Sequence, residues 1–430
     1  MSKFSSIAAA VTSGDEQALA EIASGPLVIA RNNFVERPWG GTRIRDYKRL
    51  HPLPKQSVVN GLGIGEAFEL AAFDADAEAA RYPSRVVFSD GSSTVLPELL
   101  NRHGRRLLGE AFCQRYGCSI PLLPKTLDVK ELLSVQGHPE GHTEVYIIID
   151  ADPRATIALG FSADVDAAAM RADLRDGLDR QRELVDMLRP EADQFALHNA
   201  VSAWFASRAS DGGEAVLAPF LKDEADRGAA LGLLSALKTV YWRVLDGLNH
   251  IEVEPGQVIY NATPSRLLSS EQTPSAEVHA LGNVAGREVL ALEVRLPGPT
   301  FRAWDNVRFP QREVDVDAAL TALNLRRTAA EDFLVEERPV EGRPGVSSSV
   351  ENAYFAIWHY RPGPGRAVEF GVNEPLSLHV LDGDVRVMSA DGRRLATLAR
   401  GEAALLPAGN EALRLEAADT AHVVAVALPC

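Results

Sequence analysis

Apolar and polar positions follow two periods along this chain, one typical of helices and one typical of strands. Residues 1–25 space their apolar side chains for one face of a helix. Residues 26–161 instead form short β-rich runs broken by Gly, Pro, Asp and Asn, with one helical stretch near residues 96–116. Residues 164–246, rich in Ala, Leu and charged side chains, predict several helices, and strand patterns resume at residue 251.

The last 80 residues carry a dense series of short strands joined by tight turns such as Asp391-Gly392. Evenly spaced short strands without helices predict a sandwich or barrel. The segment at 337–350 is polar and rich in Pro, Gly and Ser, which suits a domain boundary. The predicted fold class is therefore mainly β with a helical insert. The predicted domains are an N-terminal helix (1–29), a first β domain (30–163 and 247–312), a helical insert (164–246), a helix and linker (313–350) and a C-terminal β domain (351–430).

Composition and charge narrow the function classes. A hydrophobic fraction of 46% with 24% charged residues is typical of globular proteins. The 44 Lys and Arg against 59 Asp and Glu give a net charge of −15 without a basic stripe, so no nucleic-acid partner is predicted. Apolar runs are too short to cross a bilayer, and residues 1–25 lack the pattern of a signal peptide. Three cysteines build neither a disulfide framework nor a four-thiolate metal site. We therefore expect a cytoplasmic protein without a membrane partner.

The segment 128–150 carries the most informative side chains. If the residues before His138 form a strand, Ser134, Gln136 and His138 share one face of it. A hairpin would then bring Glu144 beside them, so that an amide oxygen, an imidazole nitrogen and a carboxylate meet. This set suits Zn²⁺ or another borderline divalent ion but lacks a fourth ligand. The alternative interpretation is a polar hairpin whose alternation only marks its solvent-facing side.

Seven short motifs in order along the chain resemble those of one enzyme family. They are FVERPWGG, GEAFEL, LPKTLDVKELLSVQGHP, GHTEVYIIIDADP, VEPGQVIY, VHALG and LEVRLPGPTFRAWD. At these motifs, which cover most of residues 30–310, the chain resembles the type I phosphomannose isomerases, zinc enzymes of the cupin superfamily. The resemblance implies two cupin or jelly-roll barrels, a catalytic one that binds metal and a C-terminal one.

The resemblance also implies a ligand set and a reaction. One Zn²⁺ per chain would be held by Gln136, His138, Glu144 and His279, and His279 supplies the ligand that the hairpin lacked. The implied activity is an aldose–ketose isomerisation that interconverts mannose 6-phosphate and fructose 6-phosphate through an enediol. A sugar phosphate is accordingly the implied partner, and no oligomeric state is predicted.

Five further residues receive roles from the resemblance. Arg302 lies at the implied active-site mouth, where a guanidinium suits a phosphate or an enediolate oxygen. Glu293 is the candidate base or proton relay. Ser134 and Lys130 resemble positions that face the sugar phosphate. His142 stands where the family commonly has a lysine, and an imidazole can be cationic when it is paired.

Several departures from the family leave the substrate open. The C-terminal barrel offers only His379 where metal-binding cupins need more histidines, so it is predicted to be metal-free. Residues 261–272 match none of the motifs. The helical insert is expected to pack beside the barrel mouth and narrow access to the metal. The alternatives are a non-catalytic cupin that binds a sugar or sugar phosphate, an isomerase of a different sugar, and a metal cupin acting as a lyase or oxygenase.

Overall fold

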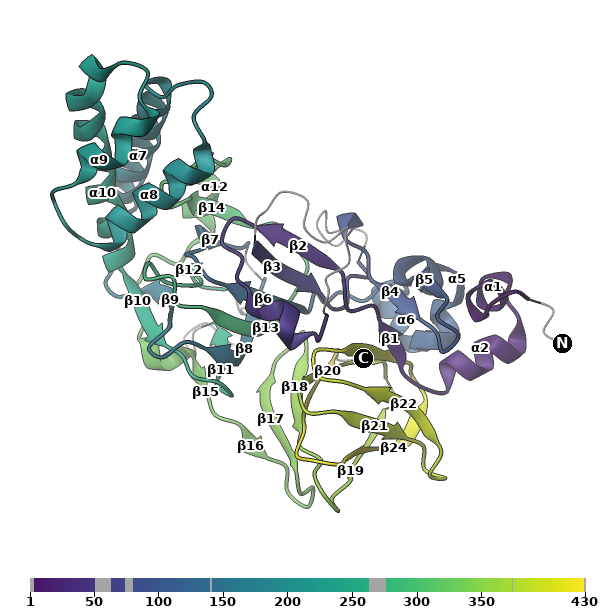
Figure 1. Cartoon of the computed structure of the whole chain (residues 1–430). Coiled ribbons are helices and arrows are strands. Elements are labelled where there is room, and N and C mark those ends of the chain that lie inside the picture. Colours follow the sequence, from purple (N-terminus) through teal and green to yellow (C-terminus); the bar gives the residue numbers. More distant parts are fainter. Residues whose placement is uncertain are drawn as a thin grey trace.

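The protein combines two β domains with two groups of helices, and we describe it from a computed structural model (Figure 1). The residues that the structure describes are 4–50, 63–73, 80–139, 141–262, 276–372 and 374–428. Apart from its first two residues, the unmatched segment 261–272 lies outside these ranges.

The first β domain consists of two facing antiparallel sheets. The seven-stranded sheet has the order β15 (Leu334–Val335), β11 (Val258–Asn261), β8 (Glu144–Ala151), β13 (Val289–Arg295), β6 (Lys125–Val129), β3 (Gly63–Phe68) and β2 (Phe34–Arg37). The five-stranded sheet has the order β10 (Leu248–Glu252), β9 (Thr156–Phe161), β12 (His279–Ala280), β7 (Val135–Gly137) and β14 (Phe301–Trp304). Alternate side chains of both sheets, such as Leu127, Ile148 and Leu159, meet in one buried cluster, which fills the space between the sheets.

The C-terminal β domain pairs strands that are far apart in the sequence. Its nine-stranded sheet has the order β16 (Arg338–Pro339), β17 (Val346–Glu351), β18 (Ala356–Tyr360), β25 (His422–Ala427), β20 (Leu376–Asp382), β23 (Ala403–Leu406), β1 (Leu27–Ile29), β4 (Arg85–Val87) and β5 (Ser93–Val95). Its four-stranded sheet has the order β19 (Val368–Val372), β24 (Asn410–Ala417), β21 (Val385–Met388) and β22 (Arg394–Leu398). Because β1, β4 and β5 extend this domain, strand pairing crosses the boundaries predicted at residues 30 and 351.

The predicted helices are present but are more broken than their apolar patterns indicated. Residues 1–25 form α1 (Ile7–Ser13) and α2 (Glu16–Ala23), since Gly14 at φ 80° ends the first helix. The stretch near 96–116 forms α5 (Leu96–Leu108) and α6 (Glu110–Tyr116), separated by Gly109 at φ 86°. Among the described residues, further helices are α3 (Arg43–Tyr47), α7 (Ala167–Asp186), α8 (Gln194–Ala206), α9 (Gly213–Leu217), α10 (Arg227–Asp246), α12 (Val316–Ala322) and the 3₁₀ turns η1 (Ala218–Phe220), η2 (Glu224–Asp226) and η3 (Ala330–Phe333).

The helical insert covers the outer face of the five-stranded sheet. Ala158 of β9 points outward into a cluster that contains Leu174 of α7 and Leu237 of α10, whereas its neighbours point into the sandwich. Asp166 caps α7 by accepting hydrogen bonds from the backbone of residues 168 and 169. Figure 1 shows this group of helices on the far side of the sheet from the C-terminal domain.

A third buried cluster joins the two β domains. It contains Ile147 and Val294 from the outer face of the seven-stranded sheet, Val424 and Val426 from the nine-stranded sheet, and Leu107 from α5. The two domains therefore pack through a continuous apolar core, which fixes their relative position.

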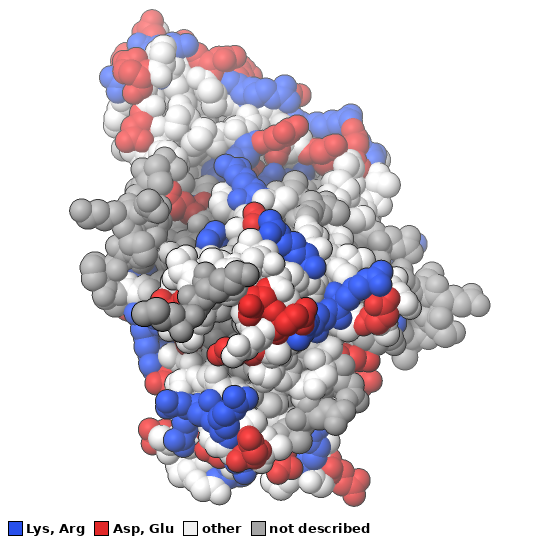
Figure 2. Space-filling model, turned by 90° about the vertical axis from the view of Figure 1, so that its right-hand side faces the viewer, with Lys and Arg blue, Asp and Glu red and all other residues white. Residues whose placement is uncertain are grey.

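Three further observations concern the cysteines, the membrane-spanning helices and the surface charge that the sequence analysis considered. A local disulfide joins Cys113 and Cys118 at the end of α6, a bridge that the sequence analysis did not predict. Within the described ranges, no helix is long and apolar enough to span a bilayer. Figure 2 shows basic and acidic side chains intermingled on the face in view, without a broad area of one sign.

Candidate metal centre

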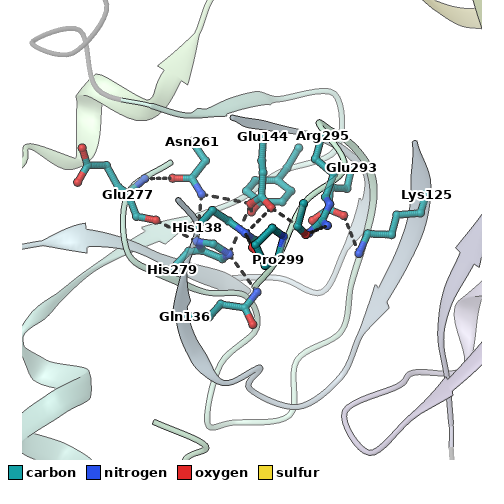
Figure 3. Close-up of polar contacts among 12 residues, drawn as sticks. Lys125, Gln136, His138, Glu144, Asn261, Glu277, His279, Glu293, Arg295 and Pro299 are labelled. Atoms are coloured by element: carbon teal, nitrogen blue, oxygen red, sulfur yellow. Dashed lines mark hydrogen bonds and ion pairs between the residues drawn. The ribbon is translucent and has the colours of Figure 1, made fainter. Parts of the chain in front are cut away.

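Four polar side chains from both sheets meet inside the first β domain (Figure 3). Gln136 in β7 and His279 in β12 are directly paired residues of neighbouring strands, and His138 follows β7. Glu144 begins β8 in the facing sheet. The predicted hairpin is therefore wrong, because β7 pairs with β12 and β14 rather than with β8. The residues meet across the sandwich instead, so the same ligand set arises by a different route.

The distances place the four predicted ligands in one group. His138 Nε2 lies 2.7 Å from Glu144 Oε1, and His279 Nε2 lies 3.5 Å from Glu144 Oε2. Gln136 Nε2 lies 3.0 Å from His279 Nε2, while Ser134 Oγ donates to Gln136 Oε1 at 3.0 Å. A half-turn of this amide would turn its oxygen toward His279. The two histidines and Glu144 are at most 1% exposed.

The orientation of the two rings fits a divalent ion. The Nδ1 atom of His138 lies 2.9 Å from the carbonyl oxygen of Pro299, and that of His279 lies 2.9 Å from the carbonyl oxygen of Glu277. A ring that donates through Nδ1 turns an Nε2 lone pair toward Glu144. His138 Nε2 has no hydrogen-bond partner among the described residues, despite its short distance to the carboxylate. Burial lowers the pKa of His279 to about 4, so its ring is neutral and able to bind metal at pH 7.

Two residues outside the predicted set hold these ligands in place. Tyr146, two residues after Glu144 on the same face of β8, donates its hydroxyl hydrogen bond to Glu144 Oε2. Asn261 Nδ2 donates to the same oxygen at 3.3 Å and lies 3.1 Å from His279 Nδ1. Asn261 also accepts from the backbone N–H of Glu277 at 3.0 Å. Sequence reasoning missed Asn261, because a single asparagine at the end of a strand gives no signal.

Changing Asn261 to Ala is expected to weaken Zn²⁺ binding about 10- to 100-fold, because residues that orient metal ligands typically contribute that much to affinity. Competition with a chromophoric chelator measures the change. Asn249→Ala is the control, since Asn249 is a half-buried asparagine of the same domain that hydrogen-bonds the backbone of Leu159 and Thr328 instead. An Asn261 variant that binds Zn²⁺ as tightly as the unchanged protein would contradict this role.

A cavity of about 420 Å³ lies beside the ligand group. Gln136 is part of its wall together with Arg37, Trp39, Glu66, Lys125, Leu127, Leu133, Ser134, Glu293, Arg295, Gly298, Pro299, Thr300, Arg302 and Arg312. Three of the predicted residues, Ser134, Glu293 and Arg302, are therefore gathered around this cavity.

Lys125 organises the acidic groups of the cavity wall. Its ammonium lies 2.7 Å from Glu66 Oε1 and 3.0 Å from Glu293 Oε2. Burial raises the pKa of Glu293 to about 7, against the opposing effect of Lys125. Burial acts in the same direction on Glu66, but Lys125 and Arg37 outweigh it and lower the pKa of Glu66 to about 2. Glu66 is thus a fixed charge, whereas Glu293 exchanges a proton near neutrality.

Two predicted substrate contacts, Lys130 and His142, do not line this cavity. Lys130 lines a different cavity of about 480 Å³, between the helical insert and the sheet. His142 is only 4% exposed and stacks on His138 with ring centroids 4.0 Å apart. Burial lowers the pKa of His142 to about 2, so its ring is neutral. His142 also forms a group of potential metal ligands with His138 and Glu144, in which one ligand atom of each lies within 4.8 Å of the others. A contact between His142 and a phosphate stays a prediction.

The expected narrowing of the metal site by the helical insert is also wrong. No described residue of α7–α10 lines the cavity at Gln136. These helices contribute His198 and Tyr241 to the cavity of Lys130 instead. The reason is that the insert packs on the outer face of the five-stranded sheet, whereas the ligands point into the sandwich.

Comparisons with known proteins identify the architecture. No protein-family profile matches the chain. A match of 24% identity over 407 residues to the mannose-6-phosphate isomerase ManA of Bacillus subtilis covers 89% of this chain and 93% of that protein. A shorter match, of 32% identity over 142 residues, covers 30% of this chain and 39% of the B. subtilis protein YvyI.

Solved structures give the same result for the fold. The crystal structure of the mannose 6-phosphate isomerase from B. subtilis superimposes with a TM-score of 0.58 at 22% identity, covering 94% of this chain and 99% of that one. A mannose 6-phosphate isomerase bound with zinc and yttrium superimposes with a TM-score of 0.56 at 14% identity, covering 94% and 99%.

The fold and the polar cluster together define a protein of two β domains with a candidate metal centre at His138 and Glu144. More particularly, the chain is similar along most of its length to the mannose-6-phosphate isomerase ManA and shares the fold of the solved mannose 6-phosphate isomerases. The resemblance found in the sequence motifs is thereby confirmed.

Proposed function

We propose that the protein is a zinc-dependent aldose–ketose isomerase that interconverts mannose 6-phosphate and fructose 6-phosphate through an enediol. The observation that carries this proposal is the meeting of Gln136, His138, Glu144 and His279 beside the cavity that contains Glu293. The names of the matched relatives and the zinc bound in one of the similar structures support it.

The chemistry requires a proton carrier and stabilisation of negative charge. Isomerisation moves a proton between C1 and C2 of the sugar while charge develops on the neighbouring oxygens. Zn²⁺ held by the four ligands would supply a Lewis acid for those oxygens. Glu293 would take the proton from one carbon and return it to the other, and a pKa of about 7 suits both directions of transfer. Lys125, 3.0 Å away, would hold the carboxylate in position.

Positive charge in the cavity wall suits a phosphorylated sugar. Arg37, Arg302 and Arg312 all line the cavity, and guanidinium groups stay charged at any pH of interest. Arg302 is half-buried and sits opposite Gln136 in the neighbouring strand. We therefore assign Arg302 to the substrate phosphate, with the enediolate oxygen as the alternative position for its charge.

The substrate is tested with purified zinc-loaded protein and a panel of mannose 6-phosphate, glucose 6-phosphate, mannose and glucose. The expected result is turnover of mannose 6-phosphate with little activity on the free hexoses. Preference for another hexose phosphate would retain the reaction type and replace the substrate. Binding of sugar phosphates without any turnover would favour the non-catalytic alternative.

Changing Arg302 to Met is expected to raise KM for mannose 6-phosphate about 10- to 100-fold, because a charge-assisted hydrogen bond contributes roughly 1.5–3 kcal/mol. Steady-state kinetics distinguishes a contact with the phosphate from a contact with the enediolate. A fall in kcat at unchanged KM would place the Arg302 guanidinium at the enediolate oxygen instead. Arg105→Met, on the exposed surface of α5, is the control and should change neither constant.

A further inference from the structure

A second group of histidine and carboxylate side chains lies in the C-terminal domain. It consists of Glu337, which precedes β16, His359 in β18 and His422 at the start of β25. β18 and β25 are neighbouring strands of the nine-stranded sheet, so the two histidines are fixed by the same ladder. Within the part of the chain that the structure describes, one potential ligand atom from each residue lies within 4.8 Å of the others.

The group lies outside the interior of the C-terminal barrel. His359 alternates with Trp358 and Tyr360, which face the barrel interior with Val423. It therefore shares the opposite face with Ile357 and Val424, which belong to the core between the two domains. Sequence reasoning had searched only the barrel motif around His379 and so predicted a metal-free domain.

The distances resemble those of the first centre. His359 Nδ1 lies 3.0 Å from His422 Nε2 and 3.6 Å from Glu337 Oε1. The His359 ring is completely buried, whereas Glu337 and His422 are half-buried. The group can thus be reached from solvent on one side while its central ligand is held in the core.

Two of the three residues, His359 and Glu337, are oriented by further contacts. His359 Nε2 lies 2.8 Å from Ser349 Oγ, which leaves Nδ1 directed at the other two residues. Arg361 donates to both oxygens of Glu337 at 2.6 and 2.7 Å, and Ser347 Oγ donates to Oε2 at 2.5 Å. Such outer contacts are typical of metal ligands, since they fix the ring and the carboxylate before an ion binds.

The charge states of the group also suit metal binding. Burial lowers the pKa of His359 to about 4 and that of His422 to about 3, so both rings are neutral at pH 7. Burial alone would raise the pKa of Glu337, but Arg361 and Ser347 outweigh it and lower that pKa to about 2. Two neutral imidazoles and one carboxylate are the ligand types that first-row divalent ions bind.

We propose that Glu337, His359 and His422 form a second metal site, which binds a first-row divalent ion such as Zn²⁺. The ion takes the place of the proton shared between the two rings and recruits Glu337 Oε1 as its third protein ligand. Three protein ligands leave at least one coordination position for water or an anion. Because Arg361 already neutralises Glu337, a bound cation leaves the site positive, and we expect weaker binding than at Gln136, His138, Glu144 and His279.

Metal stoichiometry tests this proposal without using activity. Metal-free full-length protein is dialysed against Zn²⁺, and bound zinc is measured by mass spectrometry. The expected values are two ions per chain for the unchanged protein, one for His279→Ala, one for His422→Ala and none for the double variant. His103→Ala is the matched control and should keep two, since His103 Nε2 lies 3.0 Å from the backbone oxygen of Val11, away from both candidate sites.

A second measurement tests the proposal even if His422→Ala folds poorly. In the His279→Ala background, Glu337→Gln keeps the shape of the side chain and removes its charge, so Zn²⁺ affinity should fall at least about tenfold. Co²⁺ in the same background should give visible ligand-field bands that Glu337→Gln weakens or removes. The proposal is overturned if His279→Ala binds neither Zn²⁺ nor Co²⁺, or if binding there is unaffected by both His422→Ala and Glu337→Gln. Because these readouts do not use the isomerase reaction, failure of the proposed function leaves them unchanged.

Discussion

His279→Ala is expected to lose the zinc of the first centre and to lower kcat for mannose 6-phosphate by roughly a thousandfold, because loss of one transition-state charge stabiliser typically costs that much. His279 contributes one of the two imidazole nitrogens that face Glu144, and its replacement leaves only that of His138. The fold should survive, since the sandwich core around Leu127 and Ile148 is independent of this ring. Metal analysis, circular dichroism and steady-state kinetics on one preparation measure the zinc content, the fold and kcat, respectively.

The control for this variant is a histidine of the same domain. His250 is exposed, and its Nε2 lies 2.9 Å from the backbone oxygen of Leu245, so His250→Ala should keep both metal and activity. Unchanged kcat in folded, metal-free His279→Ala would show that the reaction does not use this centre.

Glu293→Gln is expected to lower kcat by about 10²- to 10⁴-fold, the usual contribution of a general base. The amide cannot take a proton, yet it preserves the shape of the side chain against Lys125. In the unchanged protein, kcat/KM should rise as pH increases through about 7, because the raised pKa of Glu293 keeps the carboxyl protonated below that value. This rise should be absent from the residual activity of Glu293→Gln.

Changing Lys125 tests whether Glu293 causes this pH dependence, because the direction of the resulting pKa shift is known in advance. Its cation lowers the pKa of Glu293, so Lys125→Met should move the acid limb of the pH profile to higher pH. A limb that moves to lower pH, or one that persists in Glu293→Gln, would assign the titration to another group. Zinc content is measured alongside, because Lys125 pairs with Glu66 and Glu293, neither of which is a proposed ligand, so its loss should leave the zinc bound.

The sequence motifs predicted four candidate ligands that lie close together in the structure, but not the strand pairing that brings them together. The alternation of β8 correctly put Glu144 and Tyr146 on one face, and the motifs named His279 as the distant ligand. The partner of β7 could not be predicted, because strand pairing depends on contacts between residues far apart in the chain. For the same reason, the pairing of β1 with β23 across more than 370 residues was not foreseen.

The surroundings of Lys130 and His142 could not be predicted from the sequence for a similar reason. Lys125 and Lys130 belong to one motif, and only the structure shows that Lys125 reaches Glu293 while Lys130 lies in the other cavity. His142 was judged by the lysine that it replaces. Its environment is instead set by stacking on His138 and by deep burial, which no local pattern records.

The most direct test of the central claim is a zinc titration of the metal-free protein with mannose 6-phosphate as substrate, followed by NMR. The His422→Ala variant is used beside the unchanged protein so that ions bound in the C-terminal domain do not confuse the count. The expected result is no detectable fructose 6-phosphate without metal and a rate that rises with zinc until one ion per chain is bound in His422→Ala. Full activity in metal-free protein, or no isomerisation when Gln136, His138, Glu144 and His279 hold their ion, would contradict a zinc-dependent mannose 6-phosphate isomerase.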